Sequence, residues 1–298
     1  MAKSVGVFLT GRIATGVIEG RNPCSSISHH PQNPDETDSL LDTPLDQLIE
    51  LVCAQVMRAS GECGPVDAVG LALPGIVRDG VVEDSPNLIQ LKGARMVERM
   101  RHELEKHRIA AHVAVLNDAD AVAAGIAAKV GRLDKFIRVW TLGHGIGFGR
   151  YPYKEGIWEG GHCTVTLDAG EMYCGCGGRG HLEGIMGHRA MRLRFLDMEP
   201  EEVFAASKAG DERCANFVRL WHRSLAAATA NSIHMEGAGR FYYTGFNVRF
   251  LDLKLLQHYL QQMIKMSPLQ NYSVEALPMT DDLAVTGAAI AAAQTAAQ

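Results

Sequence analysis

Three cysteines and two histidines crowd into one glycine-rich stretch of the sequence, "GHCTVTLDAGEMYCGCGGRGHLEG" at residues 161–184. Zinc binds four nitrogen or sulfur ligands at tetrahedral geometry, and a Cys-x-Cys pair in a glycine turn supplies two thiolates that one ion can reach. The spacing predicts four ligands: His162, Cys174, Cys176 and His181. Four protein ligands leave no position for water, which predicts a structural ion. Cys163 competes with His162 for one position, and a glycine-rich loop whose thiols bind no metal is the alternative interpretation.

The composition argues against several classes of protein. The chain has 298 residues, of which 47% are hydrophobic, enough for two modest domains or one large one. A net charge of -5 and a pI near 6.2 create no basic field, so no nucleic-acid partner is expected. No run approaches about 18 uninterrupted apolar residues, and no signal-peptide cleavage pattern is visible, so we expect no membrane association and a cytoplasmic location. Seven cysteines, four of them scattered, favour a reducing compartment.

Predicted strands and helices alternate in the first part of the chain. The strands are expected at 4–11, 14–20, 66–75 and 111–118, and the helices at 43–60 and 94–107. Thr43 is expected to cap the first helix, with Pro44 at its first position. The order β-β-α-β-α-β indicates an α/β fold. An alanine-rich helix is predicted over 119–131. Two strands are predicted on either side of the glycine-rich turn of "TLGHGIGFG", and mostly helices are predicted after about residue 184.

A polar pair lies where the strand 111–118 gives way to the alanine-rich helix. Ligands of α/β proteins bind at the carboxyl ends of the strands, so Asp118 is a candidate general base with Asn117 beside it. A carboxylate at this position also suits the N-cap of the helix. From these residues alone, the capping role of Asp118 is favoured.

The cysteine-rich stretch is one of several segments that match a known family in order and spacing over nearly the whole chain. The others are "LALPGIV", "SPNL" at 85–88, "LNDADAVAAG" at 116–125, "TLGHGIGFG" at 141–149, "WEGGH" at 158–162 and "VTGAAIAAA" at 285–293. Together they resemble the ROK family of repressors, open reading frames and kinases, in which a third cysteine usually stands at the position of His181. The resemblance implies the two-domain actin-like ATPase and sugar-kinase fold, a ribonuclease H-like α/β architecture with an interdomain cleft. We expect a smaller domain of residues 1–117, joined by the helix 282–298, and a larger domain of residues 118–281.

The resemblance also implies ATP-dependent phosphorylation of a hexose or N-acetylhexosamine, with MgATP and a structural zinc ion. It favours Asp118 as general base over the capping role, and Asp120 is the near alternative, where the family commonly has Asn. The implied sugar-binding residues are Gly75, Asn87, Asn117, Glu159, His162 and Glu183. Zinc would order the loop that aims His162 and Glu183 at the sugar. Taken alone, Glu159 suits an exposed position and Glu183 a helix start.

The nucleotide side departs from the family pattern. The implied contacts are Thr10, Gly11, Thr141, Gly143, Gly145 and Gly245. Phe8 stands where the family has an Asp that helps to place magnesium, His144 replaces a small hydroxyl residue, and "YYTGFN" at 242–247 replaces a triple glycine. Two hypotheses follow: a glucokinase-like ATP-dependent sugar kinase, or a catalytically weak or inactive relative that binds a sugar and has a regulatory role. Relatives of this kind often form dimers, so a homodimer is expected.

Overall fold

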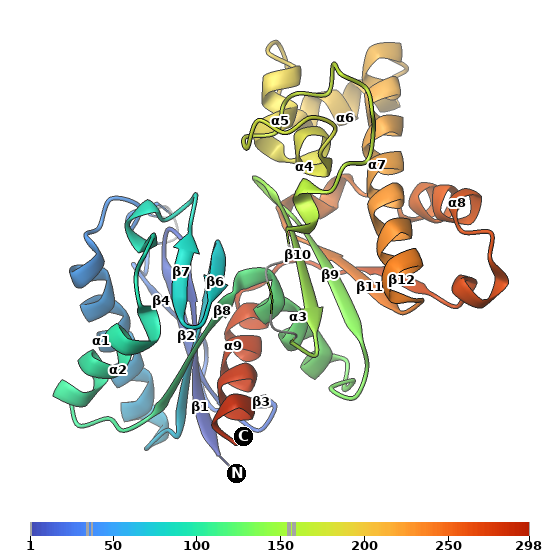
Figure 1. Cartoon of the computed structure of the whole chain (residues 1–298). Helices are drawn as coiled ribbons and strands as arrows, with labels where there is room; N and C mark the ends of the chain where they lie inside the picture. Colours follow the sequence, from blue (N-terminus) through green and yellow to red (C-terminus); the bar gives the residue numbers. More distant parts are fainter. Residues whose placement is uncertain (1, 34–35, 37, 154–155, 157–158, 298) are drawn as a thin grey trace. The chain divides into compact units, whose positions relative to one another are not determined.

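The computed structural model describes the chain apart from residues 1, 34–35, 37, 154–155, 157–158 and 298. The chain forms two compact units (Figure 1). The first unit contains residues 1–135, 149–157 and 280–298, and the second contains residues 136–148 and 158–279. The helix that follows Asn117, which the sequence assigned to the larger domain, lies in the first unit because it packs against the C-terminal helix.

A six-stranded sheet forms the centre of the first unit, in the order β3-β2-β1-β5-β8 with β4 beside β2. Its strands are β1 (Lys3–Leu9), β2 (Ile13–Glu19), β3 (Asn22–Pro23), β4 (Ser28–His30), β5 (Ala68–Leu73) and β8 (His112–Asn117). β1 pairs antiparallel with β2 and parallel with β5, which pairs parallel with β8. The central strands are apolar almost throughout because helices cover both faces of the sheet.

Helices of the first unit pack on the two faces of this sheet (Figure 1). They are α1 (Leu45–Cys63), α2 (Met96–Lys106), α3 (Asp118–Lys129) and α9 (Asp281–Ala296). α1 and α2 share one apolar core with the sheet, whereas α9 crosses the opposite face and packs against α3. Pro44, not Thr43, is the N-cap residue of α1, and no side chain makes a capping hydrogen bond there. The predicted cap by Thr43 is therefore wrong. A short hairpin of β6 (Ile76–Arg78) and β7 (Val81–Asp84) follows β5.

Helices also pack around the four-stranded sheet of the second unit, whose order is β10-β9-β11-β12. The strands are β9 (Ile137–Leu142), β10 (Ile146–Tyr151), β11 (Arg240–Thr244) and β12 (Ser273–Ala276). The helices are α4 (Leu182–Met186), α5 (His188–Arg194), α6 (Pro200–Lys208), α7 (Glu212–Glu236) and α8 (Leu253–Met263). Trp140 and Trp221 are buried in the core between them.

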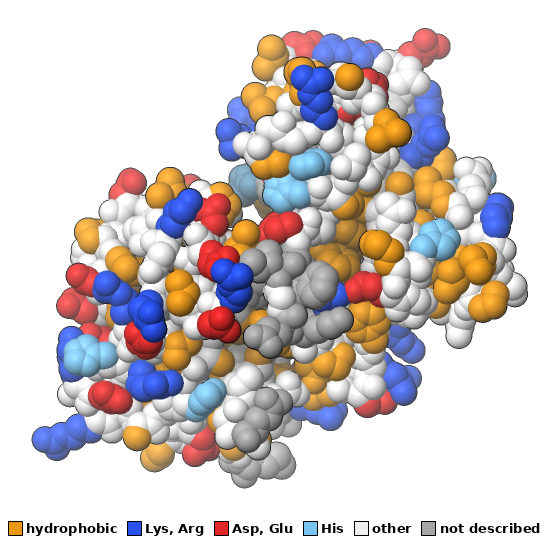
Figure 2. Space-filling view, in the orientation of Figure 1, with side chains coloured by type: hydrophobic (Ala, Val, Ile, Leu, Met, Phe, Trp, Pro, Cys, Tyr) orange, Lys and Arg blue, Asp and Glu red, His pale blue; other side chains and the backbone are white. Residues whose placement is uncertain are grey.

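Short 3₁₀ helices complete the described secondary structure: η1 (Ile89–Leu91), η2 (Gly160–His162), η3 (Phe246–Phe250) and η4 (Ser267–Gln270). None of the helices within the described residues is long and apolar enough to span a bilayer. On the face of the first unit visible in Figure 2, acidic and basic side chains are interspersed rather than gathered by sign.

α3 and α9 approach so closely that their backbones touch. A Cβ atom added to Gly287 of α9 would lie 1.7 Å from the carbonyl oxygen of Ala121, and one added to Gly125 of α3 would lie 1.9 Å from the carbonyl oxygen of Leu283. Most neighbouring positions on both helices are alanines, whose small side chains permit this distance. The contact fixes the position of α3 and therefore of Asp118, its first residue.

We expect Gly287→Ala to lower the free energy of unfolding by about 1–3 kcal/mol or more, because the added methyl group meets rigid backbone. Gly61→Ala in α1 is the matched control, since no atom lies within 4 Å of its added Cβ. This control should be neutral or stabilising by up to about 1 kcal/mol. Urea unfolding of both variants measures the difference. Equal stability of the two variants would contradict the close contact between the helices.

Candidate functional site

Four sulfur and nitrogen atoms converge in the second unit. The ligand atoms of His162, Cys174, Cys176 and His181 all lie within 4.8 Å of one another. Nδ1 of His162 lies 3.4 Å from Sγ of Cys174, which lies 3.4 Å from Sγ of Cys176. Nδ1 of His181 lies 3.3 Å from that second sulfur. Ligands of one tetrahedral zinc ion are about 3.3–3.8 Å apart, so the predicted set is brought together and fits such an ion.

Glycines shape the turn around this four-residue cluster. Gly177 has a φ of +82°, and its N–H donates to the carbonyl oxygen of Cys174 at 3.0 Å. A Cβ atom on Gly178 would lie only 2.0 Å from Cε1 of His181, so a side chain there would displace the imidazole. Burial raises the pKa of the Cys174 thiol to about 12, so the thiol stays neutral unless a cation binds it. Cys163, the predicted competitor, lies outside the metal-binding groups found among the described residues.

Glu183 connects the cluster to the turn between β9 and β10. Its Oε2 accepts a hydrogen bond from the backbone N–H of Ile146 at 2.9 Å, and its Oε1 lies 3.8 Å from Sγ of Cys174. The carboxylate lies so close to the turn that a Cβ atom on Gly145 would be 2.4 Å from Oε2. Glu183 is therefore held by its surroundings, in agreement with its expected position at the start of a helix.

The two ring nitrogens of His162 have different neighbours: Nδ1 faces the other cluster residues and Nε2 faces Glu159. Its Nε2 lies 3.8 Å from Oε2 of Glu159, while Nδ1 faces Cys174. The exposed Glu159 precedes the short helix η2, and both residues belong to the second unit. Trp158, the first residue of the same motif, lies outside the described residues. The structure thus gathers three predicted sugar-binding residues, Glu159, His162 and Glu183, around the cluster.

Asn117 and Asp118 lie in the first unit, at the carboxyl end of β8. Asn117 caps α3: its Oδ1 accepts from the N–H of Ala119 at 2.8 Å, and its Nδ2 donates to the carbonyl oxygen of Gly75 at 2.8 Å. The capping role considered for Asp118 therefore belongs to its neighbour. Asp118 is the first helical residue, where the backbone N–H groups favour a negative charge, and its Oδ1 also accepts from Ala119.

The loops that carry Gly75 and Asn87 pack together in the first unit. Gly75 has a φ of +118°, and a Cβ atom there would lie 2.1 Å from the carbonyl oxygen of Asp84. The hydroxyl of Ser85 donates to the carbonyl oxygen of Pro74 at 2.8 Å. Asn87 follows on this second loop with an exposed side chain. Gly75, Asn117 and the loop that carries Asn87 are therefore neighbours within the first unit.

Asp120 is the part-buried carboxylate beside Asp118. Its Oδ1 accepts a hydrogen bond from the backbone N–H of Arg150 at 2.8 Å, and both residues belong to the first unit. Burial raises the pKa of Asp120 to about 6, although this hydrogen bond and the charge of Arg150 oppose the shift.

Thr10 and Gly11 form the turn between β1 and β2. The N–H of Thr10 donates to the carbonyl oxygen of Arg12 at 2.9 Å, and the carbonyl oxygen of Gly11 accepts from the N–H of Leu40 at 3.1 Å. Phe8, the residue at the expected aspartate position, is only 7% exposed. The strand before this turn thus supplies an apolar, buried side chain at position 8.

The remaining predicted nucleotide contacts lie in the second unit. Thr141 is near the end of β9, and Gly143 and Gly145 shape the following turn, where the N–H of Gly143 donates to the carbonyl oxygen of Gly145 at 3.0 Å. Gly245 has a φ of +98°, and a Cβ atom there would lie 2.3 Å from the carbonyl oxygen of Leu142. Gly245 therefore packs against Leu142 at the end of β9, just before the turn that contains Gly143 and Gly145.

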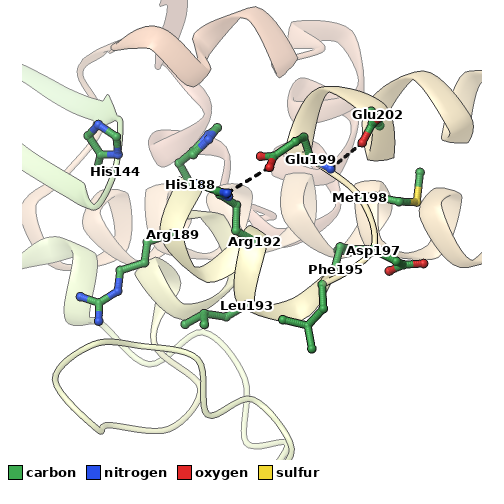
Figure 3. A pocket seen from close by; sticks show the side chains of 11 residues that line it. His144, His188, Arg189, Arg192, Leu193, Phe195, Asp197, Met198, Glu199 and Glu202 are labelled. Carbon is green, nitrogen blue, oxygen red and sulfur yellow. Dashed lines mark hydrogen bonds and ion pairs between the residues drawn. The ribbon is translucent and has the colours of Figure 1, made fainter.

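A pocket of about 830 Å³ lies beside the same turn (Figure 3). It is lined by His144, His188, Arg189, Arg192, Leu193, Phe195, Leu196, Asp197, Met198, Glu199 and Glu202. The sequence motifs single out His144 as a substitution but not the pocket residues of α5. The segment "HRAMR" could have indicated these residues, because Arg189 and Arg192 are three residues apart and therefore share one side of a helix.

Comparisons with known proteins agree with the motifs. The model of the ROK family matches residues 29–294. Glucokinase of Pyrobaculum calidifontis is 27% identical over 203 residues, which cover 63% of this chain and 62% of that protein. N-acetyl-D-glucosamine kinase of Vibrio vulnificus is 30% identical over 228 residues, covering 66% of this chain and 73% of that one. This chain thus spans under two thirds of the glucokinase.

The solved structures agree on the fold. The crystal structure of a ROK family glucokinase from Streptomyces griseus, in complex with glucose and AMPPNP, has a TM-score of 0.70 and 22% identity. The match covers 98% of this chain and 100% of that one. The predicted α/β fold of the actin-like ATPase and sugar-kinase type is confirmed by this similarity.

The raised pKa of Asp120 predicts a pH-dependent stability. Its ordinary value is 3.8 and its value in the folded chain is about 6, so the folded state binds the proton more tightly. The contribution of this carboxyl to stability is therefore present below pH 4 and is lost as the pH rises through 6. Asp120→Asn removes the ionisation and keeps an oxygen for the N–H of Arg150.

We expect Asp120→Asn to be more stable than the wild type by about 1–3 kcal/mol at pH 8, and equal within about 0.5 kcal/mol at pH 4. Urea unfolding at both pH values measures this difference. A variant that gains no stability at pH 8 relative to pH 4 would show that Asp120 ionises without penalty.

Proposed function

The chain belongs to the ROK family, and from this premise we propose that it is a sugar kinase that transfers the terminal phosphate of ATP to a hydroxyl group of a hexose or N-acetylhexosamine. The names of the relatives, glucokinase and N-acetyl-D-glucosamine kinase, support this substrate class. The observation that carries the proposal is the position of Asp118, a carboxylate at the carboxyl end of β8 and the start of α3. A general base for a sugar hydroxyl requires such a fixed carboxylate.

In the proposed reaction, the oxygen of the attacking sugar hydroxyl bonds to the terminal phosphorus of ATP while the bond from that phosphorus to the leaving ADP breaks, and Asp118 accepts the hydroxyl proton. Asn117 holds the first turn of α3 through Ala119, so the carboxylate keeps its position. The candidate sugar-binding residues within the first unit are Gly75, Asn87 and Asn117, and those within the second unit are Glu159, His162 and Glu183. Carboxylates accept hydrogen bonds from sugar hydroxyls, and these residues therefore set the orientation of the ring.

The cluster of His162, Cys174, Cys176 and His181 would hold a structural zinc ion. When bound, the ion supplies the positive charge that keeps two thiolates ionised in this loop. The role of the chain's own residues is orientation: His162 uses Nδ1 for the cluster and keeps Nε2 toward Glu159. Glu183 stays fixed between the cluster and the N–H of Ile146.

A second candidate is a sugar-binding regulatory protein with little or no catalysis. The observation that favours it is Phe8, a buried phenyl ring at the position where relatives place the aspartate that helps to hold magnesium. Phenylalanine cannot bind a cation through water. In either case we propose that the protein is a cytoplasmic homodimer. We also propose that it has no nucleic-acid partner, because its net charge is -5.

Calorimetry of the zinc-loaded protein with MgATP, alone and with glucose, N-acetylglucosamine or mannose, separates the two candidates. A kinase is expected to bind ATP, to bind it more tightly with its sugar, and to release ADP in a coupled assay. Sugar binding without ATP binding or phosphate transfer would reject the kinase and support the regulatory protein.

Replacement of the base gives the sharpest test of the mechanism. Asp118→Asn is expected to lower kcat by roughly 10²-fold or more, with the sugar Kd unchanged, because the amide cannot accept the proton. Asp134→Asn, an exposed position in the first unit, is the control and should keep full turnover. Full activity of Asp118→Asn would show that another group is the base.

Removal of a proposed zinc ligand should change metal content. Cys176→Ser is expected to lower zinc from about one ion per chain to well below one and to weaken sugar binding, because the loop loses its anchor. Cys163→Ser is the control, since Cys163 lies outside the cluster. Elemental analysis of both purified proteins measures the result. Unchanged zinc in Cys176→Ser, or its loss in Cys163→Ser, would reject the ligand set.

A further inference from the structure

Two cysteines outside the metal-binding cluster meet at one end of the first unit. Cys24 directly follows β3, and Cys63 is the last residue of α1. Cys24 is exposed, Cys63 is half-buried, and both are free thiols. The backbone N–H of Cys24 donates to the carbonyl oxygen of Val17 at 2.8 Å, which holds the segment after β3 against β2.

A pair of facing charged residues connects the two cysteines. Lys3 of β1 and Glu19 of β2 lie opposite each other in the antiparallel pairing of these strands. The ammonium group of Lys3 donates to the carbonyl oxygen of Cys63 at 2.6 Å, and the thiol of Cys24 donates to Oε2 of Glu19 at 3.9 Å. α1 therefore ends where β1 begins, at the end of the sheet that also carries the segment after β3 (Figure 1).

Asp67 holds the backbone of Lys3 in place. The N–H of Lys3 donates to Oδ2 of Asp67 at 3.0 Å, and the N–H of Asp67 donates to the carbonyl oxygen of Lys3 at 2.8 Å. Because Lys3 cannot shift without breaking these hydrogen bonds, the end of α1 that it contacts is also kept in position.

The thiols of Cys24 and Cys63 are joined by a hydrogen bond. Partial desolvation raises the pKa of the Cys24 thiol above its ordinary value of 9.0, and the Cys63 thiol and the Glu19 carboxylate raise it further, whereas the ammonium group of Lys3 lowers it. The Cys24 thiol is therefore protonated at neutral pH. Its reactive thiolate forms in a growing fraction of molecules as the pH rises.

We propose that Cys24 and Cys63 form a reversible intramolecular disulfide by exchange with a low-molecular-weight disulfide, and that this bond fastens β3 to α1. The exposed Cys24 thiolate attacks one sulfur of the small disulfide, and the other half of that molecule leaves as a thiolate. The Cys63 thiolate then attacks the sulfur of Cys24, and the second half leaves. The two protein thiols are thus oxidised and the small disulfide is reduced, and its two thiolates take up the two protons that the cysteines release.

The contact between the thiols distinguishes this site from a single exposed cysteine. A single cysteine would stop at the mixed disulfide with the small molecule. Cys63 already lies beside the sulfur of Cys24, so the second step is intramolecular and has a high effective concentration. In a reducing compartment such a bond is transient, because an excess of small thiols reverses both steps.

The disulfide would connect an edge of the six-stranded sheet to its core. β3 is exposed, and it pairs with β2 through two residue pairs. α1, by contrast, contributes many side chains to the apolar core of the unit. A covalent link from Cys24 to Cys63 therefore anchors a weakly held edge to a well-packed helix, and it also restricts the unfolded chain.

The cysteine pair lies away from the candidate base. β1 and β8 both run parallel to β5, so the beginning of β1 at Lys3 and the end of β8 at Asn117 are at opposite ends of the sheet. The modification site is therefore separate from Asp118, and the inference does not depend on the proposed kinase function.

Mass spectrometry of the full chain, purified with zinc, tests the pairing. After exposure to oxidised glutathione at pH 8, protease digestion should release a peptide pair in which Cys24 is linked to Cys63, and dithiothreitol should separate it. The digest distinguishes this link from one between Cys174 and Cys176, whose sulfurs are 3.4 Å apart. The reaction should be up to about tenfold slower at pH 7, because less of the Cys24 thiol is ionised.

Single variants separate the two steps of the exchange. Cys63→Ser should stop at the mixed disulfide, with glutathione attached to Cys24, and Cys24→Ser should give no linked peptide. Cys214→Ala, which removes a buried cysteine of the second unit, is the control and should form the Cys24–Cys63 link like the wild type. A wild type in which Cys24 stays free, keeps glutathione attached or links two chains would overturn the proposal.

Thermal unfolding tests the fastening of β3 to α1. The oxidised wild type should have a Tm about 5 °C or more above that of the reduced protein, as expected for a disulfide that closes a loop of several tens of residues. Cys63→Ser should show no such rise. A linked peptide without a rise in Tm would overturn the fastening. Because the test uses neither sugar nor ATP, failure of the kinase assay leaves its outcome unchanged.

Discussion

The hydrogen bond from the N–H of Ile146 to Glu183 holds together the second unit's whole candidate site. On one side, Glu183 reaches toward Cys174 and hence the metal-binding cluster. On the other, the same turn is fastened through Gly143 to His188 and Asn247. Glu183 is therefore the side chain that links the cysteine loop to the β9–β10 turn.

The first unit meets a different constraint, because its candidate base must be fixed at the start of a helix. Backbone contact between α3 and α9 at Gly125 and Gly287 sets the position of that helix. Asn117 accepts from the N–H of Ala119 and holds the Gly75 loop with the same side chain. Because Oδ1 of Asp118 accepts from the same N–H, the candidate base is held at the start of the helix together with its neighbour.

Sequence reasoning succeeded where the chemistry is local. The Cys-x-Cys pair and its glycines lie within a few residues of one another, so spacing alone predicts that Cys174 and Cys176 meet. The pocket beside α5 escaped prediction because His144 and Arg189 come from separate elements and meet only through tertiary hydrogen bonds. The domain assignment of α3 differed for the same reason: alanines and glycines predict helix, but its packing partner α9 lies more than 150 residues further along the chain.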